Sequence, residues 1–152
     1  AQELPRKVQN VEVLDLDGKP VKLPYFGEKN LMIFYVDPDR HKQNEDFTIE
    51  LEQNHRAESD NIHGFGVMNL KDAPMVPNGM ARNMAKKRTA KNGATVLADQ
   101  NRILSTAWAL GDCNNQFVLM IVSKEGELVF LRKGELSDAD KEAFYETIEK
   151  YK

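Results

Sequence analysis

Apolar residues recur along this chain in short runs separated by polar stretches, with the lengths expected of strands and amphipathic helices. Two of the runs are continuous, Leu31–Val36 (LMIFYV) and Phe117–Val122 (FVLMIV). A short continuous apolar run is typical of a central strand that is covered on both faces of its sheet. Both segments are therefore predicted to be central strands.

Two further patterns predict hairpins. Apolar residues alternate over Val11–Leu23, and the turn dipeptide Asp17-Gly18 stands between the two halves of that segment. An Asp-Gly pair flanked by alternating apolar residues is a strong hairpin signal. Near the end of the chain, Lys124-Glu125-Gly126 separates Phe117–Val122 from Glu127–Arg132. These last two segments are therefore predicted to pair as antiparallel strands.

The remaining predicted elements alternate between strand and helix. The strands are His63–Asn69 and Ala94–Ala98, and the helices are Asp37–Glu58, Gly79–Asn92, Asn101–Leu110 and one that begins at Ser137. Strands that alternate with helices favour βαβ units with parallel pairing, whereas the closing hairpin adds antiparallel strands. We therefore expect an α/β fold with a mixed central sheet, formed by one domain over residues 1–152.

Apolar residues at helical spacing predict which faces of the helices are buried. They are Phe47 and Leu51 with His55 one turn further, then Ile103, Leu104, Ala107 and Trp108, and finally Phe144, Ile148 and Tyr151. In the last helix Ser137 is the predicted N-cap, and Asp140 is placed to complete a capping box.

The composition describes an ordinary globular chain. It has 152 residues, of which 41% are hydrophobic and 30% charged, and this balance indicates a folded protein. The net charge of −3 gives no reason to expect nucleic acid as a partner. The longest apolar run, Leu31–Val36, is too short to cross a bilayer. The opening AQELP is consistent with a mature end left by signal-peptide cleavage, although an artificial boundary would give the same sequence.

The chain has one cysteine, Cys113, in the sequence GDCNNQ. A single cysteine forms neither an intramolecular disulfide nor the dithiol pair of an oxidoreductase. The negative charge of Asp112 beside it disfavours the thiolate form. Cys113 is therefore predicted to be a small, partly buried residue. The alternative is a catalytic role, in a single-thiol peroxidase or a protein that forms mixed disulfides.

The second half of the chain contains a characteristic succession of motifs. Over Ala94–Asp140 a strand is followed by an acidic turn, a helix ending in Trp-x-Leu, a strand, a Lys-x-Gly turn, a strand, and Gly-x-Leu-Ser before the last helix. This segment and the loop Met75–Met84 (MVPNGMARNM) resemble the YtfJ family of bacterial periplasmic thioredoxin-like proteins, whose function is poorly defined. The first half matches the family by element order alone.

The resemblance implies a thioredoxin-like fold in its extended, peroxiredoxin-like form, with helices on both faces of the sheet, and a periplasmic location. The sequence departs from redox-active relatives in two ways. No Cys-x-x-Cys follows Leu31–Val36, and no proline precedes Phe117–Val122, where such proteins have a cis-proline. Asn114, Asn115 and Gln116 stand there instead. We therefore expect a binding module that needs no cofactor, rather than a dithiol enzyme.

The sequence DPDRH after the first central strand has two explanations. As a helix start, Asp37 is a good N-cap, Pro38 suits the first helical position and Asp39 suits the helix dipole. As a ligand site, Asp37, Asp39 and His41 have donor atoms for a divalent metal. Arg40 at a strand end suits an anion. The helix start is the favoured explanation, and a metal- or anion-binding module is the alternative.

Two surfaces are candidates for partner binding. In a thioredoxin-like fold the segments Asp37–His41, Met75–Asn78 and Cys113–Gln116 meet at the C-terminal edge of the central strands, and we expect them to form a groove for an extended peptide of a partner protein. The second candidate is the basic run Arg82–Lys91 (RNMAKKRTAK). It is either ordinary solvated surface or a binding site for an acidic partner. The run lacks aromatic residues for base stacking, so no nucleic-acid partner is expected.

Overall fold

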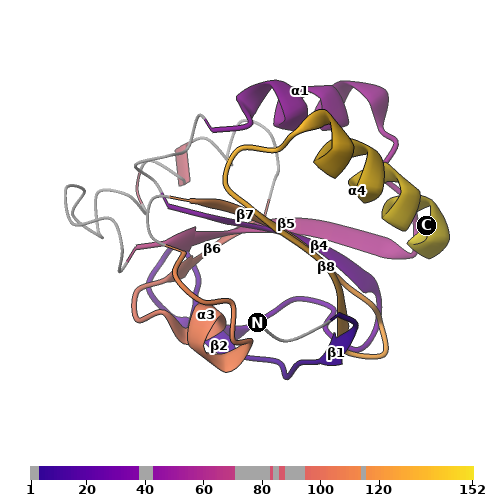
Figure 1. Ribbon diagram of the computed structural model, residues 1–152. Helices are drawn as coiled ribbons and strands as arrows, with labels where there is room; N and C mark the ends of the chain where they lie inside the picture. The colour runs from indigo at the N-terminus through magenta and orange to yellow at the C-terminus, as the bar shows by residue number, and fades with distance from the viewer. Residues whose placement is uncertain (1–3, 38–42, 71–82, 84–85, 88–94, 114–115) are drawn as a thin grey trace.

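The computed structural model describes residues 4–37, 43–70, 83, 86–87, 95–113 and 116–152 (Figure 1). Within them an eight-stranded sheet has the order β1-β8-β7-β4-β5-β6-β2-β3. The strands are β1 (Arg6–Lys7), β2 (Glu12–Leu14), β3 (Pro20–Lys22), β4 (Asn30–Val36), β5 (Ile62–Asn69), β6 (Val96–Asp99), β7 (Phe117–Val122) and β8 (Glu127–Lys133). The pairs β4–β5 and β5–β6 are parallel and the other pairs are antiparallel, which confirms the predicted mixed sheet.

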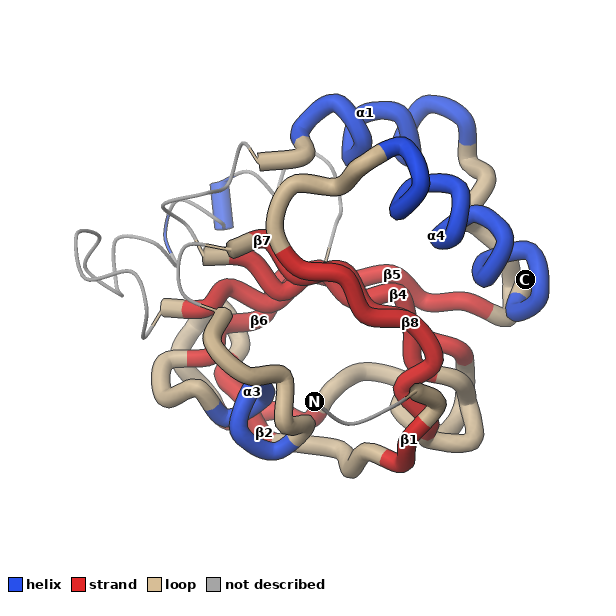
Figure 2. Tube along the Cα trace, viewed as in Figure 1, coloured by secondary structure: helices blue, strands red, loops and turns tan. Residues whose placement is uncertain are grey.

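Helices cover both faces of this sheet, as predicted. Helices α1 (Glu45–Asn54) and α4 (Asp138–Tyr151) lie on one face, and α3 (Ile103–Ala107) lies on the other face together with β1 and β2 (Figures 1 and 2). In the described part of the chain, every helix is too short or too polar to cross a membrane.

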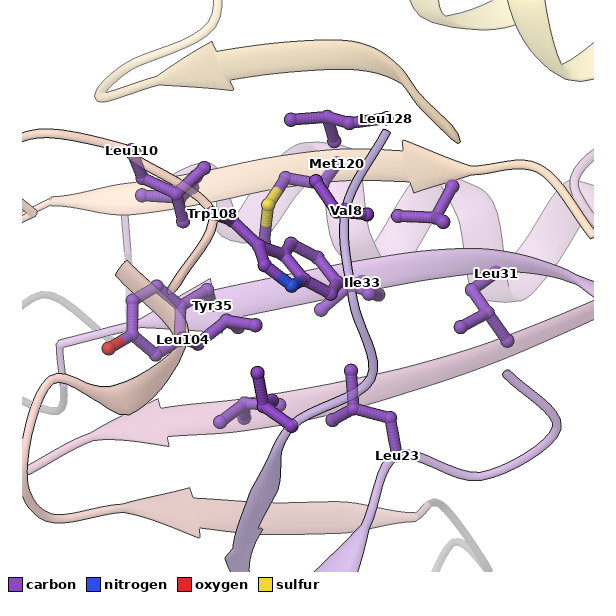
Figure 3. Packing of buried hydrophobic residues seen from close by; sticks show 14 of the residues in the cluster. Val8, Leu23, Leu31, Ile33, Tyr35, Leu104, Trp108, Leu110, Met120 and Leu128 are labelled. Carbon is purple, nitrogen blue, oxygen red and sulfur yellow. The ribbon is translucent and has the colours of Figure 1, made fainter. Parts of the chain in front are cut away.

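Alternation along β4 divides the core into two clusters. Leu31, Ile33 and Tyr35 point toward the α3 face, where they pack with Trp108 and Met120 (Figure 3). The indole nitrogen of Trp108 donates a hydrogen bond to the carbonyl of Gln9 at 2.7 Å. The polar atom of this buried ring is therefore satisfied, and the ring contributes its full apolar area to the core.

The second cluster joins α1 and α4 to the opposite face of the sheet. Phe47 of α1 meets Phe144 of α4 edge to face, with ring centroids 5.4 Å apart, and Phe144 also meets Phe130 of β8 at 5.8 Å. Leu51 and Ile148 complete the contact, as the helical spacing predicts. Edge-to-face aromatic pairs stabilise by roughly 0.5–1.5 kcal/mol beyond the area that they bury.

The short-range signals in the sequence are confirmed. Strands β2 and β3 pair across the Asp17-Gly18 turn, in which Gly18 has a φ of +82° that favours glycine. Strands β7 and β8 pair across the predicted second turn. The hydroxyl of Ser137 accepts a hydrogen bond from the N–H of Asp140, and the carboxylate of Asp140 accepts one from the N–H of Ser137, which completes the capping box of α4.

The predicted start of the first helix at Asp37 is wrong for α1, which begins at Glu45 after the N-cap Asn44. Asn44 has a φ of +62°, in the left-handed region. Its side chain is held by distant backbone, because the amide nitrogen donates to the carbonyl of Gly134 at 2.9 Å and the oxygen accepts from the N–H of Leu136 at 2.8 Å. Asp37 is instead a fully buried residue at the end of β4.

Two predicted core residues are exposed. His55 does not pack against the sheet, because α1 ends at Asn54 and His55 is its C-cap, with a φ of +56°. Its side chain is exposed and contacts the carboxyl group of Glu58. Ala107 is also exposed, since α3 buries Leu104 and Ser105 and presents its last residue to solvent.

Several predictions lie wholly or partly outside the described residues. Among the positions of the predicted helix Gly79–Asn92, the structure describes Asn83, Lys86 and Lys87, and all three are helical. The loop Met75–Asn78 lies entirely outside the described residues, and so does the segment from Pro38 to Lys42.

Candidate functional site

The carboxyl ends of β4, β5 and β6 meet the loop before β7 at one edge of the sheet. The N–H of Asp37, just after β4, donates to the carbonyl of Gln116 at 3.2 Å. At the end of β5, the side-chain amide of Asn69 donates to the carbonyl of Cys113 at 3.3 Å. Asp37, Asn69 and Cys113 are all buried. The loop before β7 is therefore bound to the ends of both central parallel strands.

Three of the predicted site residues, Asp37, Cys113 and Gln116, are thus brought to the same edge. The other predicted site residues, Asp39, Arg40, His41, Asn114 and Asn115, lie outside the described residues. Within the described ranges, no three His, Cys, Asp or Glu side chains gather in a way that could hold a metal ion. The metal- or anion-binding alternative at Asp37–His41 stays a prediction.

Sequence reasoning missed the best-connected polar group of this edge, the carboxyl group of Asp99 at the end of β6. One of its oxygens accepts hydrogen bonds from the N–H groups of Asn101 and Ile103, at 3.1 and 2.9 Å. The other accepts from the N–H of Leu104 and from the hydroxyl of Tyr35, both at 2.9 Å. Asp99 therefore holds the first turn of α3 and joins it to β4.

The environment of Tyr35 keeps its hydroxyl protonated. Burial raises the pKa of Tyr35 far above its usual value, and the negative charge of Asp99 and the hydrogen bond to it act in the same direction. A hydrogen bond with Ser105 of α3 acts the other way. At neutral pH Tyr35 is therefore protonated and donates a hydrogen bond to Asp99.

A partial signal for this network is present in the sequence. An aspartate between a strand and a helix is well placed to cap that helix with its carboxylate. Asp99 stands in that position, in the turn after the predicted strand Ala94–Ala98. Its partner Tyr35 is 64 residues away, inside a continuous apolar run, and no local pattern connects the two residues.

A cleft of about 600 Å³ opens between α3 and the loop before β7. Its lining mixes hydroxyl, charged, thiol and backbone groups, from Arg102, Ser105, Thr106, Ala109, Gly111, Asp112 and Cys113. The thiol of Cys113 lies 3.7 Å from the carbonyl oxygen of Gly111, and the residue is only 2% exposed. Cys113 is thus a covered part of the cleft wall, more deeply buried than the sequence predicted.

Lys133 at the end of β8 holds the segment Leu110–Asp112, which forms the side of this cleft opposite α3. Its ammonium group donates to the carbonyl of Leu110 at 2.5 Å and to that of Asp112 at 3.2 Å. Gly111 lies between them with a φ of +77°, and a β-carbon added there would come 3.2 Å from the Lys133 nitrogen. Both the backbone angle and the close approach therefore favour glycine at this position.

The second candidate surface, the basic run Arg82–Lys91, is described at few positions. Lys86 forms an ion pair with Asp17 in the hairpin turn, although both side chains are at least half exposed. The hydrogen bond and the positive charge of Lys86 lower the pKa of Asp17. Lys87 is exposed. An acidic partner for this run stays a prediction.

No family model matches the sequence, and no curated protein matches it. Solved structures do match over nearly the whole chain. A peroxiredoxin-like protein from Aquifex aeolicus aligns with a TM-score of 0.67 at 11% identity, over 97% of this chain and 88% of that one. The exposed lipoprotein thioredoxin of Streptococcus pneumoniae aligns with a TM-score of 0.62 at 18% identity, over 93% of this chain and 99% of that one.

The thioredoxin domain of a thiol-disulfide oxidoreductase from Bacteroides vulgatus gives the same result, with a TM-score of 0.62 at 14% identity over 99% of both chains. At these identities the likeness concerns the fold. The shared architecture agrees with the mixed sheet and with the helices on both of its faces. The chain therefore has the thioredoxin-like α/β fold.

Proposed function

We propose that this protein is a thioredoxin-fold binding module of the bacterial periplasm that acts without a dithiol. Its binding surface is the cleft between α3 and the loop before β7, and its ligand is an extended peptide segment of a partner protein. The periplasmic location and the kinship with the YtfJ family are supported by the motifs over Ala94–Asp140 and by the loop Met75–Met84.

The observation that carries this proposal is the position of the only thiol. The sequence has one cysteine, and it lies before β7 rather than after β4. Dithiol exchange needs a second cysteine to resolve the mixed disulfide. Cys113 is also 2% exposed, so a bulky disulfide substrate does not reach its sulfur in the native state.

Thiol assays on the purified protein test the absence of redox activity. We expect no reduction of insulin disulfides in the presence of dithiothreitol beyond the rate of the reductant alone, and no consumption of hydrogen peroxide. An active thioredoxin in the same assay shows that the conditions support catalysis. Turnover by the wild-type protein that disappears in Cys113→Ser would refute the proposal.

A peptide array tests the binding surface. The cleft is lined mainly by polar residues, among them Thr106 and Asp112, which suits the amides of an extended peptide. Thr106→Trp fills the cleft from an exposed position on α3, and Ala139→Trp places the same ring on the exposed side of α4. Peptides should bind the wild type and Ala139→Trp but not Thr106→Trp. Equal binding by both variants would exclude the cleft as the binding surface.

A single-thiol redox protein is the second candidate, because Cys113 lies on the cleft wall with Arg102. In that case hydrogen peroxide would oxidise the Cys113 thiolate to a sulfenic acid and release hydroxide. The pH dependence of alkylation separates the two candidates. An apparent pKa near that of free cysteine, about 8.5, agrees with the binding module, and a much lower value would favour the redox protein.

A further inference from the structure

His63, the second residue of β5, lies in an aromatic cluster away from the cleft. The ring of Tyr25 meets it edge to face, with centroids 4.8 Å apart, and the ring of Phe65 stacks on it at 5.7 Å. Tyr25 is 45% exposed and has a φ of +59°, so an exposed aromatic residue covers His63 from a left-handed backbone position. Left-handed backbone is strained for a residue with a side chain.

The position of His63 favours the neutral imidazole. Its Nε2 atom is buried and accepts or donates no hydrogen bond within the described part of the chain. Burial lowers the pKa of His63, and the positive charge of Lys29 lowers it further. The ammonium group of Lys29 lies over the Tyr25 ring, 4.8 Å from its centroid.

Other charged groups stand on the elements that adjoin His63, but none of those described is hydrogen-bonded to it. They are Glu28 in the same turn as Lys29 and Asp60 before β5. A proton on His63 therefore adds a positive charge near Lys29 and leaves a buried N–H group without an acceptor. Because the Tyr25 ring lies against the imidazole, moving it away would expose that group to water as an acceptor.

Tyr25 belongs to a turn that is held by its own carbonyl oxygen. The N–H groups of Glu28 and Lys29 both donate to the carbonyl of Tyr25, at 2.9 and 3.0 Å. The next residue, Phe26, reaches the main core and lies 6.4 Å from the ring of Trp108. A displacement of Tyr25 is therefore reported by two amide protons and by the single tryptophan of the chain.

We propose that His63 is an acid-sensitive latch: the neutral ring lets the turn Tyr25–Lys29 close over the core, and protonation opens that turn. In the open or unfolded state the imidazole takes its proton near pH 6.5. The latch is therefore fully closed above about pH 6.5 and weakens as the pH falls from there toward the lowered pKa of the closed form. This device is independent of the binding function proposed above.

Nuclear magnetic resonance on the wild-type protein tests the latch. The His63 ring should titrate below the ordinary imidazole pKa of about 6.5. The opening equilibrium constant, from exchange of the Glu28 and Lys29 amides corrected for intrinsic rates, should rise by up to about tenfold per pH unit below pH 6.5. A His63 ring that titrates at or above the ordinary imidazole pKa of about 6.5, or an opening constant that changes less than about twofold between pH 8 and pH 5, would overturn the proposal.

Three variants test whether His63 causes the pH dependence of turn opening. His63→Gln should abolish the pH dependence of turn opening, whereas the matched control His55→Gln, on an exposed histidine, should keep it. Tyr25→Ala removes the cover and should return the pKa of His63 toward its ordinary value. An unchanged pH dependence in His63→Gln would also refute the latch. The wild-type titration decides the matter even if a variant does not fold.

Discussion

Tyr35→Phe removes one hydroxyl group from the core and leaves the apolar ring in place. That hydroxyl donates one of the four hydrogen bonds that the carboxyl group of Asp99 accepts. Four donors directed at two oxygens suit an ionised carboxylate, which is an acceptor only. A hydrogen bond to a charged group contributes about 1.5–3 kcal/mol. Because three backbone donors remain, we expect a loss of about 2 kcal/mol in the free energy of unfolding.

Urea unfolding followed by the fluorescence of Trp108 measures this loss, with the urea dependence of the free energy unchanged. For a chain of this size the melting temperature should fall by roughly 4–8 °C. The control is Tyr145→Phe, because the hydroxyl of Tyr145 bonds to the exposed side chains of Glu50 and Asn54. A surface interaction of this kind contributes about 1 kcal/mol or less.

Combining Tyr35→Phe with Asp99→Asn completes a double-mutant cycle. Residues in direct contact show interaction energies of about 0.5–3 kcal/mol, so the two substitutions should not be additive. If Tyr35→Phe costs less than about 0.5 kcal/mol, or no more than Tyr145→Phe, the Asp99 network does not stabilise the fold as argued.

Three further outcomes are expected. Asn30→Ala should lower the unfolding free energy by about 1–3 kcal/mol in urea titrations, because the Asn30 side chain bonds both the carbonyl of Tyr151 and the N–H of Lys124; a neutral effect would contradict this. Ser137→Ala should cost about 1 kcal/mol at pH 7. The backbone N–H of Ser137 lowers the pKa of Asp140 below its ordinary 3.8, so the stability that the Asp140 carboxylate contributes exists above that pH and is lost as the pH falls through the lowered pKa. Equal losses of stability in Asp140→Ala at pH 7 and pH 2 would count against this half of the capping box. Cys113 should react with iodoacetamide at least about tenfold more slowly in the native protein than in urea, and a rapid native reaction would show that the thiol is accessible.

The sequence predicts those parts of the fold that local patterns determine. Leu31–Val36 and Phe117–Val122 are continuous apolar runs because both faces of β4 and β7 are covered. Asp17-Gly18 and Ser137 act through neighbouring backbone, and their predictions are confirmed. The pairing of β2 with β6 has no such signal, because it depends on the position of the hairpin beside the finished sheet.

The predictions that were wrong concern positions that contacts distant in sequence determine. Helix α1 begins at Glu45 because Asn44 is bonded to backbone about ninety residues further along the chain, and Asp37 offers a good local cap that α1 does not use. The position of His55 continues the helical period of Phe47 and Leu51, but the helix has already ended there. The candidate site follows this pattern, since the link from Asp99 to Tyr35 depends on two strands that are distant in sequence.

The double hydrogen bond of Asn44 has a mechanical consequence. One side-chain amide connects the beginning of α1 with the segment that leads into α4. A displacement of the segment before α4 therefore pulls on the beginning of α1 as well, unless both bonds break. The far end of α4 is held separately, because the side-chain amide of Asn30 in β4 donates to the carbonyl of Tyr151.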